Sequence, residues 1–169
     1  MDLILALAVS IGLLGGVATY LFLTVGAIQI WVGFIAWASF YHCGGGTDGL
    51  KKSLAANIWG AFVGFVALLA ITKISVAMPG VLWASIVVAV TAFVLVLAAK
   101  FEPLGAIPAS VYGYAAIAGY GLMSGASLTE GSLANPLACV IISLILGGIF
   151  GIVSEKLAGV MTAKSQPAE

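Results

Sequence analysis

Residues 1–23 read MDLILALAVSIGLLGGVATYLFL, and no charged side chain follows Asp2 in this stretch. An α-helix rises about 1.5 Å per residue, so about 20 apolar residues cross the ~30 Å hydrocarbon core of a bilayer. The run is too long for the apolar region of a secretory signal peptide, and no basic residue precedes it. It predicts a first membrane helix that the protein retains.

The overall composition also favours a bilayer as solvent. Of 169 residues, 63% are hydrophobic and 7% are charged, and the mean hydropathy is +1.24. Soluble domains carry about 25% charged residues, so six basic and six acidic side chains cannot cover a soluble surface. Net charge is zero and arginine is absent, which excludes nucleic acid as a partner. We expect an all-α, polytopic membrane protein in contact with the lipid bilayer.

Short turns divide the chain into six apolar segments, which predict about six transmembrane helices. The segments are Leu3–Leu23, Gly26–Tyr41, Leu54–Thr72, Gly80–Ala99, Pro103–Met123 and Leu133–Val153. They form a single transmembrane domain over residues 1–158, and residues 159–169 form a polar, flexible tail. The second segment is short for a span and the fifth is irregular, so whether these two cross fully stays open.

The lysines predict the orientation of the chain. With six spans, five lysines lie on one side of the membrane and Lys73 lies alone on the other. The five are Lys51, Lys52, Lys100, Lys156 and Lys164. Because cytoplasmic loops carry an excess of basic residues, both termini are expected in the cytoplasm. No repeat is visible in the sequence, since segments one to three and four to six share neither motif nor spacing; a purely structural inverted repeat stays open.

Small residues recur at helical spacing in three segments. Such stripes let helix backbones approach closely in lipid, which predicts helix packing at Gly12, Gly16, Ser143, Gly147 and Gly151. The third segment carries a similar stripe with Asn57, Gly60 and Gly64 on one face. These three residues either pack against a neighbouring helix or line a narrow path. In the second case Asn57 offers a hydrogen-bond donor and an acceptor to a solute.

The chemically crowded stretch Phe40–Ser53, FYHCGGGTDGLKKS, is interpreted mostly as a turn. A single histidine cannot form a zinc or haem site within one chain, Cys43 beside His42 lacks a third catalytic group, and the glycine run lacks the phosphate-loop lysine. We therefore expect no catalytic residue, no metal and no cofactor. Phe40, Tyr41 and His42 are candidates for the inner mouth of a pore, with His42 as a pH-sensitive element.

The fifth segment is the second candidate site, because Pro103, Gly105 and Pro108 disfavour a regular helix there. Irregular backbone at membrane depth is tolerated only inside protein or along a water-filled cavity. The backbone around these residues therefore either lines a passage or lies at the interface as an ordinary helix start.

Two stretches, SFYHCGGGTDGLKKSLAANIWGAFVG and FEPLGAIPASVYGYAAIAGYG, resemble the bacterial inner-membrane family named domain of unknown function 1097. The resemblance rests on the order of features and runs over about residues 3 to 155. It implies a small multi-pass protein of the bacterial cytoplasmic membrane, and it brings no established set of catalytic residues.

Together these features favour a channel or facilitator for a small neutral or weakly polar solute, because no ring of buried charge is available to select an ion. We expect a symmetric homo-oligomer. The alternative is a non-transporting scaffold or accessory subunit of a larger complex. A membrane enzyme or redox protein, which predicts a bound metal or cofactor, is disfavoured because the sequence shows neither a set of metal ligands nor a complete catalytic group.

Overall fold

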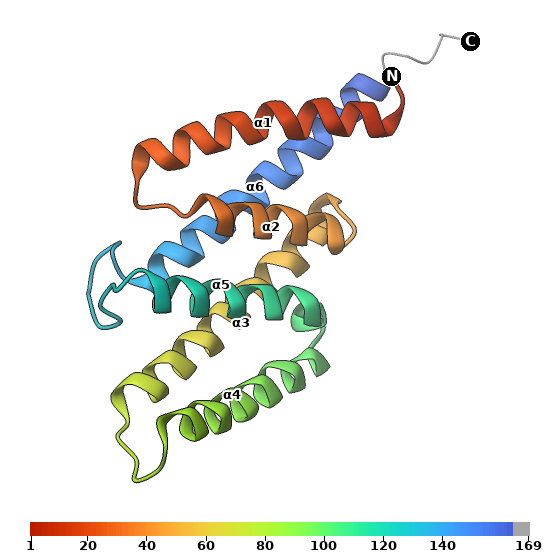
Figure 1. Ribbon diagram of the computed structural model, residues 1–169. Coiled ribbons are helices and arrows are strands. Elements are labelled where there is room, and N and C mark those ends of the chain that lie inside the picture. The colour runs from red at the N-terminus through yellow and green to blue at the C-terminus, as the bar shows by residue number, and fades with distance from the viewer. Residues whose placement is uncertain (164–169) are drawn as a thin grey trace.

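The structure is a computed structural model that describes residues 1–163, and the regular structure in this range is helical. Six α-helices follow one another: α1 (Leu3–Val25), α2 (Ile30–His42), α3 (Gly46–Lys73), α4 (Gly80–Leu97), α5 (Ile107–Met123) and α6 (Pro136–Ala163). Two short 3-10 turns, η1 (Ala98–Lys100) and η2 (Glu102–Leu104), join α4 to α5. The chain reverses direction at each connection, so the N-terminus and the end of α6 lie at the same end of the molecule (Figure 1).

Four of the six helices are long and apolar enough to cross a membrane: α1, α3, α6, and α4 together with η1. The other two are shorter. At about 1.5 Å per residue, the 13 residues of α2 extend about 20 Å and the 17 of α5 about 26 Å, less than the ~30 Å of hydrocarbon. The prediction of an all-α, multi-pass membrane protein is thus confirmed. Of the six helices predicted to cross the membrane, four are candidate spans, and α2 and α5 are shorter.

Two helices are longer than the hydrophobic segments that predicted them. α3 begins at Gly46, ahead of the expected Leu54, because Gly44, Gly45 and Gly46 adopt positive φ and turn the chain before the polar residues start the helix. α6 continues past the expected Val153 to Ala163 and includes the start of the expected tail, of which residues 164–169 lie outside the described range.

The two halves of the chain repeat one arrangement, which the sequence did not reveal. α1–α3 and α4–α6 each run in the order long, short, long, and the halves are intertwined. The long helix α3 packs mainly against the short helix α5, and α6 packs mainly against α2. Likewise α1 lies on α6 and α4 lies on α3 (Figure 1).

Glycines mark equivalent contacts in the two halves. A Cβ on Gly60 of α3 would overlap the carbonyl oxygen of Ser110, the fourth residue of α5. A Cβ on Gly147 of α6 would overlap the carbonyl oxygen of Gly33, the fourth residue of α2. The backbones of each pair therefore touch directly.

The same register continues one helical turn further along both long helices. A Cβ on Gly64 would lie 2.5 Å from Ile117 Cγ2, and a Cβ on Gly151 would lie 2.8 Å from Phe40 Cδ1. Ile117 follows Ser110 at i+7, as Phe40 follows Gly33. Two matched contacts in one register establish the repeat.

The outer helices α1 and α4 are mostly exposed, as expected for surfaces that face lipid. Gly12 and Gly16 lie on this outer surface, and a Cβ on either would meet no atom within 4 Å. Within residues 1–163 they make no helix contact, whereas Ser143, Gly147 and Gly151 lie at the contact of α6 with α2.

Candidate functional site

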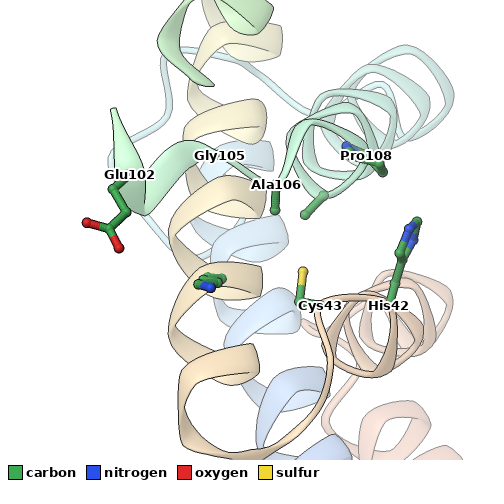
Figure 2. Close-up of a pocket in the computed structure, with 8 residues that line it drawn as sticks. His42, Cys43, Glu102, Gly105, Ala106 and Pro108 are labelled. Atoms are coloured by element: carbon green, nitrogen blue, oxygen red, sulfur yellow. The ribbon is translucent and has the colours of Figure 1, made fainter. Parts of the chain in front are cut away.

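A pocket of about 370 Å³ lies where the C-terminal end of α2 meets the start of α5 (Figure 2). We call it the terminus-side pocket, because it lies at the end of the molecule that holds the N-terminus. Its lining combines three titratable or charged side chains with a thiol and small residues: His42, Cys43, Lys52, Glu102, Gly105, Ala106, Pro108 and Ala109. Figure 2 shows His42 and Cys43 pointing from α2 toward Ala106 and Pro108, while Glu102 points away.

The turn between α2 and α3 supports one side of this pocket. The Gly46 N–H donates a hydrogen bond to Glu155 Oε2 of α6 over 2.8 Å, and a Cβ on Gly45 would overlap the other carboxylate oxygen. A carboxylate at a helix N-terminus also interacts favourably with the helix dipole. Asp48 instead forms an exposed ion pair with Lys51 at 3.9 Å, which contributes little to stability.

The interruption in the fifth segment lies before α5 and not within it. Pro103 is part of η2, Gly105 follows that turn, and Pro108 is the second residue of α5, a position that tolerates proline well. Gly105 and Pro108 line the terminus-side pocket, whereas Pro103 lines a neighbouring surface hollow together with Asp48 and Lys51.

Of the three residues predicted at an inner mouth, His42 lines the pocket. Its Nδ1 lies 2.9 Å from the Tyr112 hydroxyl of α5, so the pair joins the two short helices. Phe40 is fully buried against Gly151. The Tyr41 hydroxyl shares a hydrogen bond of 2.7 Å with Ser154 Oγ of α6, so it too faces away from the pocket lining.

A buried polar cluster holds α2 and α3 together. Asn57 Nδ2 donates to Ser39 Oγ over 2.9 Å and to Ser53 Oγ over 3.1 Å, and Ser53 Oγ donates to Ser39 Oγ over 2.9 Å. Asn57, Ser39 and Ser53 are fully buried. The contact with a neighbouring helix that was one expectation for Asn57 is therefore present.

Two atoms in this region have no hydrogen-bond partner among residues 1–163. They are Asn57 Oδ1 and Ser110 Oγ, and both residues are buried. Burial of an unpaired polar atom costs free energy, about 1–3 kcal/mol, so each such atom needs an explanation such as a bound water or ligand.

Sequence neighbours connect the cluster to the pocket. Cys43 lies in the pocket lining one helical turn after Ser39, and Ala109 lies in the lining directly before Ser110. Burial raises the pKa of the Cys43 thiol, and hydrogen bonding to the Ser39 side chain and the charge of Lys52 partly offset this. Polar groups thus run from the pocket to the buried Asn57.

Gly60 and Gly64 lie farther along α3, where their contacts are with the backbone and side chains of α5 and not with a cavity. Asn57 is part of this helix contact through its backbone, because a Cβ on Gly113 of α5 would overlap the backbone carbonyl oxygen of Asn57. Across residues 1–163 no three His, Cys, Asp or Glu side chains gather as a metal site would require.

Sequence reasoning missed the roles of Ser39 and Glu155. Ser39 could have been found, since it is a polar residue one turn before Cys43 on the helix that ends at the crowded stretch. Glu155 carries no such signal, because its partner Gly46 is distant in the sequence.

Known proteins identify the family and no activity. The profile of a family described as a protein of unknown function (DUF1097) matches residues 8–159. The uncharacterized protein YahC of Escherichia coli (strain K12) is 35% identical over 115 residues, which cover 64% of this chain and 70% of that relative. No solved structure matches the chain. The chain belongs to the DUF1097 family, as its sequence features predicted, and it is a multi-pass membrane protein.

Proposed function

We propose that this protein provides a passage for a small neutral or weakly polar solute, with the terminus-side pocket as one entrance. The observation that carries the proposal is the pair of buried, unpartnered atoms Asn57 Oδ1 and Ser110 Oγ. Ser110 directly follows Ala109 of the pocket lining, and Asn57 is hydrogen-bonded to Ser39, which bonds in turn to Cys43 of that lining. In lipid the cost of an unpaired polar group is high, and a passing solute or water would provide the missing hydrogen bonds.

The available groups favour neutral solutes that carry a hydrogen-bond donor. Asn57 Nδ2 is occupied by Ser39 and Ser53, so the amide offers its carbonyl oxygen as an acceptor. The Ser110 hydroxyl can donate or accept. Small amides, polyols and undissociated monocarboxylic acids fit this pair of groups, whereas a carboxylate anion has no hydrogen to offer to Asn57 Oδ1.

The proposed setting is the bacterial inner membrane with both termini in the cytoplasm. Lys51, Lys52, Lys100 and Lys156 belong to the end of the molecule that holds the N-terminus, and Lys73 ends α3 at the other. The exposed apolar faces of α1 and α4 are available for lipid and for a symmetric homo-oligomer.

Reconstitution into liposomes tests this function. The wild-type protein should accelerate the shrink–swell response to at least one of acetamide, glycerol and acetic acid. Asn57→Leu should abolish that flux while the protein still assembles, because the Ser53–Ser39 hydrogen bond remains. Wild-type liposomes that respond no faster than empty ones to all three solutes would contradict the proposal.

Ser110→Ala is the matched variant for the second atom. Since Ser110 Oγ bonds to no residue in the described chain, its removal should leave the thermal unfolding temperature unchanged or raise it, and should still slow the flux. An unchanged flux would remove Ser110 from the path.

A non-transporting scaffold or accessory subunit is the second candidate, and the close glycine contacts of α3 with α5 and of α6 with α2 favour it. This role predicts co-purification with another subunit and an absence of flux for every solute.

A further inference from the structure

A second pocket lies at the other end of the α2–α5 pair and has a volume of about 520 Å³. We call it the opposite pocket. Its lining comes from the start of α2 and the C-terminal end of α5: Gln29, Trp31, Gly119, Tyr120, Met123 and Ser124. The terminus-side pocket is lined by the opposite ends of the same two helices, the C-terminal end of α2 and the start of α5.

This exchange of ends between α2 and α5 holds position by position. Gln29 and Ala106 are the N-cap residues of α2 and α5, and each lines the pocket at its own helix start. Trp31 and Pro108 are the second residues of these helices. The register is the one set independently by the glycine contacts, in which the fourth residues of α2 and α5 are equivalent.

We propose that the two pockets are the two mouths of one path, which an inverted repeat places on opposite sides of the membrane. That a solute passes between the two pockets rests on the proposed function. That the pockets lie on opposite sides of the membrane rests on the geometry alone. α2 and α5 run in opposite directions (Figure 1), so equivalent ends of the two helices lie at opposite ends of the molecule. Inverted repeats of this kind are a common plan for membrane proteins that move solutes.

The short helices explain how such a path crosses the bilayer. The 13 residues of α2 separate the two pockets by about 20 Å, while α3 and α6, with 28 residues each, extend about 42 Å beside them. A solute that enters either pocket therefore has about a third less than the ~30 Å hydrocarbon thickness left to cross. In the proposed path, the unpartnered atoms of Asn57 and Ser110 would provide polar groups for the solute.

The two mouths differ in chemistry although they share positions. The terminus-side pocket includes His42, Lys52 and Glu102, whereas the lining of the opposite pocket has no charged side chain. A neutral solute can pass both, whereas a charged one would have to leave a mouth with charged side chains for one that has none.

Two cysteines at equivalent positions test the inference. In a background of Cys43→Ser and Cys139→Ala, we would introduce Ala106→Cys or Gln29→Cys; neither N-cap side chain makes a capping bond that the change would remove. A membrane-impermeant methanethiosulfonate reagent should label the two cysteines from opposite sides in inside-out and right-side-out vesicles. A bulky adduct at either should lower acetamide flux by about tenfold or more, because it fills a mouth.

Exposed positions outside both linings, one in the first turn of α3 and one in the α5–α6 connection, serve as controls. An adduct at Thr47→Cys or Ala134→Cys should leave the flux unchanged. Labelling of Ala106→Cys and Gln29→Cys from the same side would overturn the inference whatever the flux. Labelling from opposite sides with undiminished flux after modification of Gln29→Cys would overturn the opposite pocket as a mouth. If wild-type vesicles pass no solute, the proposed function and the path fall together, and opposite-side labelling would still establish that α2 and α5 begin on opposite sides of the membrane.

Discussion

At the scale of single residues, Glu155 has the clearest structural role. It is a carboxylate near the C-terminal end of an apolar helix, and it accepts a hydrogen bond from Gly46 at the N-terminus of α3. It therefore links the last helix of the second half to the turn that supports the terminus-side pocket.

Substitution of Glu155 should loosen that turn. Glu155→Gln keeps an acceptor oxygen and loses the charge that favours a helix N-terminus, so we expect a loss of about 0.5–1 kcal/mol of stability. Glu155→Ala also leaves the Gly46 N–H without its partner and should cost about 1–3 kcal/mol. Thermal unfolding in detergent would measure both, with Glu130→Gln in the exposed α5–α6 loop as a control expected to change nothing. Equal stability of the Gln and Ala variants would contradict this role.

At the scale of helices, direct backbone contact at glycine distinguishes the two halves' inner packing from their outer surfaces. Gly60 and Gly147 lie against carbonyl oxygens of the short helices, and Gly12 lies in open space on α1. Glycine is therefore required for close helix contact at Gly60 and Gly147, whereas no neighbouring atom requires it at Gly12.

A comparison of three alanine variants would make this difference measurable. Gly60→Ala and Gly147→Ala should each destabilise the protein by about 1–3 kcal/mol or more, because the new methyl group forces the helices apart. Gly12→Ala should be neutral or stabilising by up to about 1 kcal/mol, because alanine favours helix and meets no neighbour. A large difference between Gly60→Ala and Gly147→Ala in unfolding temperature would contradict their equivalence in the repeat.

Hydrophobic segments predicted the number and order of the helices well, and their ends less well. α1 and α4 lie within two residues of their predicted bounds because they are apolar throughout. α3 begins eight residues early because polar residues also form helix outside the hydrocarbon, where hydropathy gives no signal. The glycine stripes were visible in the sequence, but which stripe meets another helix depends on tertiary contacts that spacing alone does not fix.

At the scale of the whole molecule, the alternating direction of six helices brings the N-terminus and the end of α6 to one end. Fusion of green fluorescent protein or alkaline phosphatase to either terminus tests which side that is. We expect fluorescence and no phosphatase activity for fusions at both termini, because the basic residues gather at that end. A phosphatase fusion placed after Ala77, in the α3–α4 connection, should be active and provides the control. Opposite results at the two termini would contradict the alternation.

The candidate site shows where sequence reasoning stops. His42, Gly105 and Pro108 were predicted and do line one pocket. Ser39 and the opposite pocket were not predicted, because the first depends on a hydrogen bond between helices and the second on a symmetry with few identical residues. Leu144 stands at the place in α6 that corresponds to Asn57, three residues before the equivalent glycine. The halves therefore share a backbone arrangement and differ in their polar side chains.

The intertwined halves also determine when the protein can fold during synthesis. α2 packs mainly on α6, which leaves the ribosome after the other five described helices. Until then this 13-residue helix lacks its principal partner and is too short to cross the bilayer by itself. A ribosome that stops before α6 thus leaves a nascent chain whose second helix has no stable place in the membrane.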